Sequence, residues 1–421
     1  MIRSFFRRNE MLRTLFSLKG NARGCLWPEP LWGIPYNLSL PYASLYMAAL
    51  GLSPSQMGYV ASISIVAQVI FSALSGVLTD KLGRRWTTLI FDTLAWSVPE
   101  FIWMLSKDVN WFIAAALFNG AWRVTENSWS LLLIEDMKEE EIMPAFSLTQ
   151  MLGLLSAFFA PLSKFAIDAF GLIPTMRVLY GVTGVSMTVK FLLVHLMCKE
   201  TQVGLRRIEA TRKRSILSML WECRTVYLRI VLNPRMLLTF GILAAFSLVK
   251  TLSNTYWSLL VCAQLGVSES NVVLYATLKS LVTLFCVLAL VPRVSRMPVK
   301  RPLLSSLFAY IGSLLLLLCA PTGAAGVLML LCSCVMEAAA LSVLSPIANS
   351  LLFINAEPEE RARVCGMIYA TIALLTAVFP GVVGQMAEIS LRIPFFICIG
   401  LFAFAALLTV LLCRLPQEDR A

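Results

Sequence analysis

Charged residues are scarce in this chain of 421 residues. Asp, Glu, Lys and Arg make up 14% of it and hydrophobic residues 58%, and the mean hydropathy is +0.77. A water-soluble globular protein of this length needs far more charge to cover its surface. The composition therefore excludes a soluble globule and indicates an integral membrane protein with many spans.

Histidine is almost absent, and the cysteines lack metal-binding spacing. His195 is the one histidine, and the 11 cysteines lie mostly within apolar runs without a C-x-x-C pair. Zinc sites and disulfide frameworks need such patterns, and no glycine-rich phosphate loop follows a strand. We therefore expect neither a metal nor another cofactor, and we do not expect an enzyme.

Asp and Glu together are fewer than Lys and Arg, 24 against 35, and the formal net charge is +11. The Lys and Arg residues lie in short segments between apolar runs, as residues that anchor a protein at the inner leaflet do. We therefore expect a lipid bilayer as the partner of this positive charge, and no nucleic acid.

Apolar runs are the dominant feature of the chain. About 20 apolar residues cross the roughly 30 Å of hydrocarbon in a bilayer. The runs that meet this length predict an all-α membrane protein with twelve spans, near residues 31–50, 55–79, 86–106, 111–134, 143–167, 172–197, 235–262, 270–291, 302–320, 324–353, 364–387 and 393–413.

The connections between these spans predict the orientation. Lys and Arg gather after the second, sixth, eighth and tenth spans, whereas the loops on the other side are nearly free of them. Basic connections stay in the cytoplasm. We therefore expect both termini to be cytoplasmic, in the plasma (cell inner) membrane, and we expect a monomer.

The longest polar interruption divides the chain into two halves. Gly51–Gln56 resembles Gly266–Asn271, and Ser130–Ile134 resembles Ser350–Ile354, so we expect two pseudo-symmetric six-helix bundles. The predicted domains are a basic cytoplasmic arm over 1–24, a bundle over 25–198, a cytoplasmic linker with an amphipathic surface helix over 199–234, a second bundle over 235–414, and a cytoplasmic tail over 415–421.

A short basic segment, G-V-L-T-D-K-L-G-R-R at 76–85, joins the second and third spans. Gly76 and Asp80 lie one helical turn apart and so share a face, where the glycine permits close backbone approach. Gly83 ends the helix, and Arg84 and Arg85 hold the turn on the cytoplasmic side.

This segment resembles the loop between helices 2 and 3 of the major facilitator superfamily. It matches that family's pattern G-x-L-x-D-[RK]-x-G-[RK]-[RK] at every specified position. The resemblance implies a twelve-helix transporter fold in which Asp80 contacts the start of helix 11 and Arg84, and so latches the outward-facing state. The gating motif would comprise Gly76, Asp80, Gly83, Arg84 and Arg85.

Polar residues recur at helical spacing along four predicted spans, which are the cavity-lining helices 1, 4, 7 and 10 of the superfamily that the chain resembles. A charged group inside a bilayer is costly, so it faces a cavity or a partner. We therefore predict a substrate and proton cavity lined by Asn119, Arg123, Glu126, Lys250, Asn254, Glu337 and Tyr42. The alternative for Arg123 and Glu126 is an ion pair that neutralises itself for packing.

These features predict a secondary active transporter that works by alternating access around a central site. Both charge signs and several aromatic residues favour a small organic solute, amphiphilic or zwitterionic. Glu126 or Glu337 could carry a proton, so we expect proton coupling, with efflux favoured over uptake. The alternative is a protein of the same fold that has lost transport and acts as a membrane sensor or scaffold.

Overall fold

The computed structural model describes residues 18–137, 139–215, 234–289, 297, 300–354, 370–412 and 414, and every regular element in these ranges is a helix. The first half contains α3 (Gly20–Leu26), α4 (Glu29–Ser39), η1 (Leu40–Tyr42), α5 (Ala43–Ala49), α6 (Pro54–Leu82), α7 (Arg84–Asp92), η2 (Thr93–Ser97), α8 (Val98–Leu105), α9 (Val109–Asn119), α10 (Trp122–Ile134), α11 (Glu139–Ser156), η3 (Ala157–Phe159), α12 (Leu162–Phe170) and α13 (Leu172–Met197). The linker contributes α14 (Gln202–Thr211). The second half contains α16 (Pro234–Leu265), η4 (Glu269–Asn271), α17 (Val272–Ala289), α19 (Lys300–Cys319), α20 (Ala324–Ile354), α22 (Phe379–Ile389) and α23 (Ile393–Leu412).

Within these described ranges, nine helical segments are long and apolar enough to cross a membrane. They correspond to nine of the twelve predicted spans, so the all-helical membrane fold is confirmed, while the number twelve stays a prediction. The segments are Pro54–Leu82, Leu148–Phe170, Leu172–Met197, Pro234–Leu265, Glu269–Val287, Lys300–Cys319, Ala324–Ile347, Ala370–Ile389 and Ile393–Leu412.

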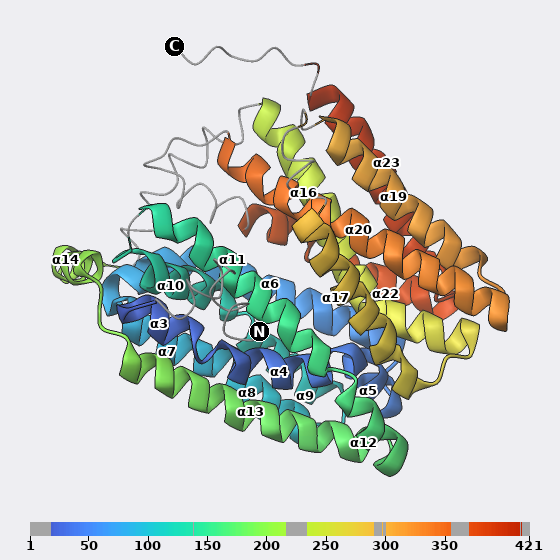
Figure 1. Cartoon of the computed structure of the whole chain (residues 1–421), viewed down its shortest axis with the longest axis horizontal. Coiled ribbons are helices and arrows are strands. Elements are labelled where there is room, and N and C mark those ends of the chain that lie inside the picture. The colour runs from blue at the N-terminus through green and yellow to red at the C-terminus, as the bar shows by residue number, and fades with distance from the viewer. Residues whose placement is uncertain are drawn as a thin grey trace, which may run out of the picture.

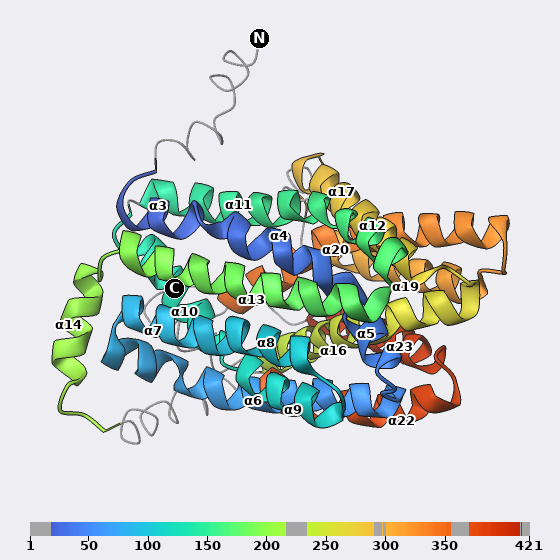
Figure 2. The same cartoon turned by 90° about the horizontal axis from the view of Figure 1, so that it is seen from below.

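The other three predicted spans are each divided into shorter helices. The span at 31–50 is interrupted by a 3-10 turn at Leu40–Tyr42, which contains a proline, and the span at 86–106 by a π turn at Thr93–Ser97. The span at 111–134 breaks at Gly120. Figure 2 shows α7 and α8 in line along α13, so the divided helix still follows its neighbour.

Local chemistry explains where the long helix α6 begins and ends. Ser53 and Gln56 form a capping box, in which each side chain accepts from the other residue's backbone N–H. Pro54 occupies the first helical position, where its missing N–H costs nothing. At the other end Gly83 has φ +82°, a conformation that favours glycine. The turn after α6 therefore depends on that glycine.

The two halves are joined near the start of α6, which we call the closed end. The opposite end, where α6 stops at Leu82 and α14 lies, we call the linker end. Figure 1 shows the halves side by side around α5, α17 and α22, and spread apart toward α14. Hydrogen bonds between described residues join the halves at the closed end, among them Tyr42 to the Ser270 carbonyl (3.0 Å), Ser44 with Ser258 (2.8 Å), Tyr256 to the Pro54 carbonyl (3.1 Å), the Gly381 N–H to Ser62 (2.9 Å), and Gln385 to Tyr59 (2.5 Å).

Close backbone contact between α6 and α22 accompanies these bonds. A Cβ placed on Gly58 would lie 2.3 Å from the Pro380 carbonyl oxygen and 2.8 Å from the Tyr256 hydroxyl. A Cβ on Gly384 would lie 2.9 Å from the Pro54 carbonyl oxygen. The two helices can pack this closely because both faces carry glycine.

The predicted N-terminal arm is only partly separate from the first bundle. Residues 1–17 lie outside the described part of the chain, but α3 packs against α10 and α13. The Asn21 side chain accepts from the Lys199 N–H (2.8 Å) and donates to the Lys199 carbonyl (2.9 Å) and to Asp136 (3.2 Å). Residues 18–24 are therefore part of the bundle, because Asn21 fastens α3 to the end of α13.

Three further predicted features fall outside the described residues. They are the amphipathic helix expected at 216–227, the start of helix 11 at 358–363, and the tail at 415–421.

Replacing Gly58 with alanine should destabilise the closed end. The added methyl group meets backbone rather than a flexible side chain, and overpacking of this kind costs about 1–3 kcal/mol. We expect Gly58→Ala to lower the midpoint of thermal denaturation of the purified protein in detergent. Gly153→Ala is the matched control, since a Cβ on Gly153 would meet no described atom within 4 Å. Equal midpoints for the two variants would contradict this account of the closed end.

Candidate functional site

A polar face lies on α10, directly after the break in the fourth predicted span. The break lets Gly120 sit against α6, where a Cβ would lie 2.4 Å from the Cβ of Ala67. Arg123 follows one turn later and pairs with Glu126 at 2.8 Å. Its Nε donates to Gln68 on α6 (3.3 Å), and its guanidinium lies 4.1 Å from the Trp122 ring centroid. The arginine is thus held by three neighbours while Glu126 stays 48% exposed.

The second half contributes Lys250 and Asn254, which lie one turn apart on α16 and are both exposed. The charges of Arg123 and Glu126 are near enough to act on the Lys250 ammonium. In the part of the chain that the structure describes, Lys250 makes no ion pair or hydrogen bond. Two cations and one carboxylate from the two halves therefore lie near one another in the middle of the predicted spans, and the Glu126 and Lys250 side chains are exposed. We call Arg123, Glu126, Lys250 and Asn254 the central polar cluster.

Three other predicted cavity residues take different positions. Tyr42 is fully buried and forms one of the hydrogen bonds at the closed end. Glu337 is buried in the second half, where it pairs with Lys279 at 2.7 Å. Asn119 donates to the Ala95 carbonyl (3.0 Å) in the π turn of helix 3. Helical spacing places these residues on a polar face, but it cannot distinguish a face that contacts water from one that contacts another helix.

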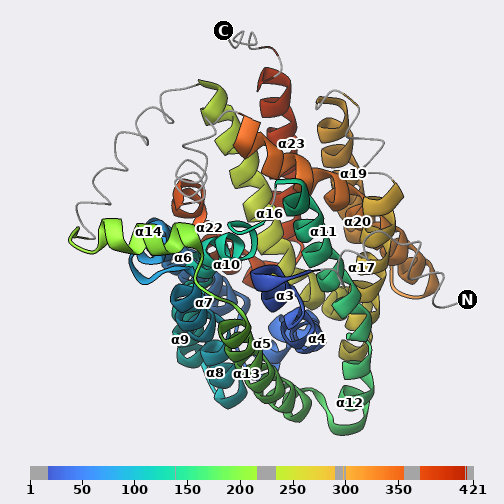
Figure 3. The ribbon, with the colours of Figure 1, turned by 60° about the vertical axis from the view of Figure 1, so that its left-hand side comes forward.

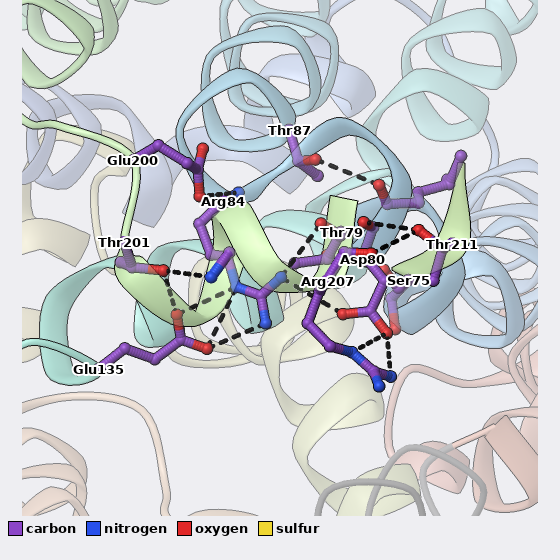
Figure 4. Close-up of polar contacts among 12 residues, drawn as sticks. Ser75, Thr79, Asp80, Arg84, Thr87, Glu135, Glu200, Thr201, Arg207 and Thr211 are labelled. Atoms are coloured by element: carbon purple, nitrogen blue, oxygen red, sulfur yellow. Dashed lines mark hydrogen bonds and ion pairs between the residues drawn. The ribbon is translucent and has the colours of Figure 1, made fainter. Parts of the chain in front are cut away.

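A second cluster lies at the linker end, around the hinge segment at 76–85 (Figure 4). Here α7 begins immediately after Gly83, and its first two N–H groups point at the Glu200 carboxylate. Arg84 N–H donates at 2.8 Å and Arg85 N–H at 3.0 Å. An anion is stable at this position because the N-terminus of a helix carries partial positive charge. Glu200 therefore caps α7 from a distant part of the sequence.

The Arg84 side chain is buried, with 4% of its surface exposed. Its guanidinium donates to Glu135 at 3.0 and 3.1 Å and to Asp80 at 3.3 Å. Thr201 also donates to Glu135. A buried guanidinium needs carboxylates of this kind, since an unpaired buried charge is strongly destabilising.

Asp80 is held by the linker helix α14. Arg207 donates to one Asp80 oxygen through Nε (3.1 Å) and Nη2 (2.5 Å), and these hydrogen bonds raise the pKa of the Arg207 guanidinium. Thr211 donates to the Asp80 backbone carbonyl (3.1 Å). A Cβ on Gly204 would lie 2.1 Å from Glu200 and 3.0 Å from the Arg84 side chain, so α14 can dock this closely only with glycine there.

The remaining hinge residues take different roles. Arg85 donates to the His195 carbonyl at the end of α13 (2.8 Å), which fits its predicted place in the turn. Among the described residues nothing approaches Gly76 closely, since a Cβ there would meet no described atom within 4 Å, so the close approach expected at Gly76 stays a prediction. Figure 3 shows α14 across the end of α6, with the helices of the first half beneath it.

Sequence reasoning missed the residues that contact this hinge from elsewhere in the chain. They lie in two polar connections, which the sequence analysis treated only as acidic or basic loops. One weak signal was present: Thr201 followed by Gly204 is the spacing of a helix cap, and Thr201 does accept from the Gly204 N–H (2.9 Å). The missed residues are Glu135, Glu200, Thr201, Gly204, Arg207 and Thr211.

Removing Arg207 should release α14 from the hinge. A partly exposed ion pair contributes on the order of 1 kcal/mol, which corresponds to about a fivefold change in an equilibrium. We therefore expect Arg207→Ala to speed tryptic cleavage at Arg212 and Lys213 several-fold in the purified protein, as followed by mass spectrometry. Arg206→Ala is the matched control, because it removes one neighbouring tryptic site from an exposed arginine. Cleavage that is no faster in Arg207→Ala than in this control would argue against docking by Arg207.

Comparison with solved structures shows what this fold is similar to. The nucleoside transporter NupG superposes with a TM-score of 0.72 at 15% identity, over 94% of this chain and 100% of that one. A POT family transporter in complex with 5-aminolevulinic acid gives a TM-score of 0.70 at 14% identity, over 93% and 95% of the two chains. Identities this low show the fold alone.

Curated relatives match over shorter stretches. The multi-drug resistance efflux pump PmrA of Streptococcus pneumoniae is 26% identical over 175 residues, which are 40% of this chain and 43% of that protein. The uncharacterized transporter ESBP6 of Saccharomyces cerevisiae is 28% identical over 149 residues, 34% of this chain and 22% of that protein. The matched stretches thus span less than half the length of these relatives.

The model of the Major Facilitator Superfamily matches residues 33–352 and, in a second match, 245–421. These matches cover most of the chain and include both the hinge and the central polar cluster. The protein therefore belongs to the major facilitator superfamily and is an integral membrane protein with several spans.

Proposed function

We propose that this protein is a secondary active transporter that moves a small organic solute by alternating access, with efflux favoured over uptake. One observation supports this above the others. Arg123 and Glu126 of the first half face the same solvent-accessible region as Lys250 of the second half, in the middle of the spans. A solute held there contacts both halves, so its binding responds to any movement between them.

The chemistry of the central polar cluster supports a solute with an anionic group. Arg123 and Lys250 carry two positive charges against the single negative charge of Glu126. A carboxylate or phosphate fits the planar fork of an arginine, and the exposed Lys250 can approach the same group. Trp122, beneath the Arg123 guanidinium, offers an apolar surface to the rest of the solute. An amphiphilic or zwitterionic molecule satisfies all of these groups.

Glu126 offers a simple route to proton coupling. If the anionic group of a zwitterion takes the place of Glu126 on Arg123, the freed carboxylate can accept either the ammonium group of the solute or a proton. The two exclude each other, because one carboxylate cannot be both paired with a cation and neutral. Mutual exclusion of solute and proton yields exchange, in which protons enter as the solute leaves.

The contacts between the halves support an inward-open conformation. All the hydrogen bonds described between them lie at the closed end, and we propose that this is the outer end, with both termini and α14 in the cytoplasm. In this conformation Asp80 forms an ion pair with Arg207. We propose that Asp80 exchanges Arg207 for the start of helix 11 when the transporter turns outward, as the hinge motif implies. We further propose a monomer in the plasma (cell inner) membrane.

The proposal predicts which side chains a solute needs. We expect a thermal-shift screen of the purified protein against metabolites and drugs to give stabilising hits among anionic and zwitterionic compounds. Arg123→Ala and Lys250→Met should abolish the shift, since each removes a cation from the binding region. Lys107→Met is the control, because Lys107 is an exposed residue in a connection. A hit that binds but is not moved across proteoliposomes would favour a membrane sensor instead.

Glu126→Gln separates coupling from binding. The amide cannot carry a proton, so we expect the variant to lose accumulation of a screened hit driven by a pH gradient in proteoliposomes. Exchange of labelled for unlabelled solute at equal pH should continue, because it needs no net proton movement. Accumulation that keeps its pH dependence would remove Glu126 from the coupling mechanism.

A further inference from the structure

One buried carboxyl group among the described spans has no counter-charge. Glu126 pairs with Arg123, Glu337 with Lys279, and Glu29 with Lys190 at 3.1 Å. Asp92 lies within the field of the same Lys190 and bonds with Thr125. Glu100 differs from all of them: it is 8% exposed, it makes no ion pair with a described residue, and its Oε2 has no hydrogen-bond partner.

The π turn of helix 3 accounts for the position of Glu100. Eight α-helical steps from Asp92 would leave Glu100 about 80° away around the helix. A π turn contains one extra residue, which reduces the rotation about the helix axis between Asp92 and Glu100 by about 100°. The two carboxyl groups therefore lie on nearly the same face of the helix. Both are buried, and α13 packs along the whole of this helix, from α7 through η2 to α8. Glu100 therefore points into the first half.

The groups around Glu100 provide no positive charge. The two tyrosines within electrostatic range of Glu100 are Tyr36 on α4 and Tyr180 on α13. The Tyr180 hydroxyl and the Ser97 hydroxyl are also buried without a hydrogen-bond partner. Arg177 on α13 donates instead to the Ser106 carbonyl (3.4 Å), and α9, the other helix along α8, carries no ionisable residue. A carboxyl group in such surroundings is stable only when it is protonated and therefore neutral.

The π turn also connects Glu100 to the central polar cluster. The Ala95 carbonyl, within the turn, accepts the hydrogen bond from Asn119 (3.0 Å). Asn119 ends α9, immediately before the break that precedes Arg123. The helix that carries Glu100 and the helix that carries the cluster are thus fastened together at this point.

We propose that Glu100 is a second proton-binding site, inside the first half and separate from the central polar cluster. It holds its proton in the conformation described here. A role of this proton in transport rests on the proton coupling of the proposed function. The presence of the proton on Glu100 is independent of that function.

Infrared difference spectroscopy of the protein in phosphatidylcholine and phosphatidylglycerol vesicles tests the site without a solute. We expect the carbonyl band of a protonated carboxylic acid at neutral pH, which disappears in alkaline buffer. Glu100→Gln should remove this band, and Glu126→Gln and Glu337→Gln should leave it. A spectrum of Glu100→Gln identical to that of the parent protein would overturn the proposal.

Thermal denaturation provides a second measurement that also needs no solute. Glutamine resembles a protonated glutamate, so we expect Glu100→Gln to leave the midpoint unchanged at neutral pH. Glu337→Gln is the matched comparison and should lower it, because the partly buried Lys279 then loses its counter-charge. Equal losses in the two variants would show that Glu100 is ionised and would overturn the site. If the band belongs to Glu100 but no solute moves, the proposed function fails and the proton site stands.

Discussion

A charge inside a membrane needs either a counter-charge or water, and the ionisable residues of this protein follow that constraint. Lys190 is buried beside Glu29 at 3.1 Å, and the partly buried Lys279 lies beside the buried Glu337 at 2.7 Å. Arg123 and Glu126 both pair with each other and reach solvent. Ion pairs shielded from solvent thus lie within each half, and the solvent-exposed charged groups of the central polar cluster lie where the halves face each other. This division supports the proposal that a solute binds at the central polar cluster.

The two ends of the molecule are held by different chemistry. At the closed end the halves meet through glycines, through hydroxyl and amide groups, and through the carboxyl groups of Asp168 and Glu388, which bond with serines of the opposite half. A neutral hydrogen bond of this kind contributes about 0.5–1.5 kcal/mol. At the linker end, Arg84, Asp80 and Glu135 form a charged network within the first half and its linker. Individually weak bonds of this kind can open and re-form, which fits the proposed alternating access. Among the described residues the charged network does not contact the second half, so the hinge would stay intact in such a movement.

Much of this architecture could be predicted from the sequence, because long apolar runs and the hinge motif are local signals. The divided helices could not be predicted in detail. The π turn at Thr93–Ser97 precedes Pro99, which lacks the N–H that would bond the Ala95 carbonyl, but a proline within a span does not by itself specify a π turn. Arg123, Glu126 and Lys250 were predicted as cavity residues and do lie in one region. Tyr42 and Glu337 have the same helical spacing but are buried, because spacing reports a polar face and not the partner of that face. The contacts of α14 with the hinge join residues more than 100 positions apart, which no local pattern records.

Docking of α14 on the hinge shortens the part of the linker that can span the distance between the two halves. Arg207 and Thr211 fix Gln202–Thr211 on the hinge. The connection that spans the distance to the second half is therefore counted from Arg212 instead of Lys199. The roughly 22 residues that remain before Pro234 reach at most about 75 Å when fully extended, and undocking would add about 13 more, or some 45 Å. The same contact that occupies Asp80 therefore sets how far one half can travel from the other, and a ligand or modification that frees α14 would loosen both restraints together.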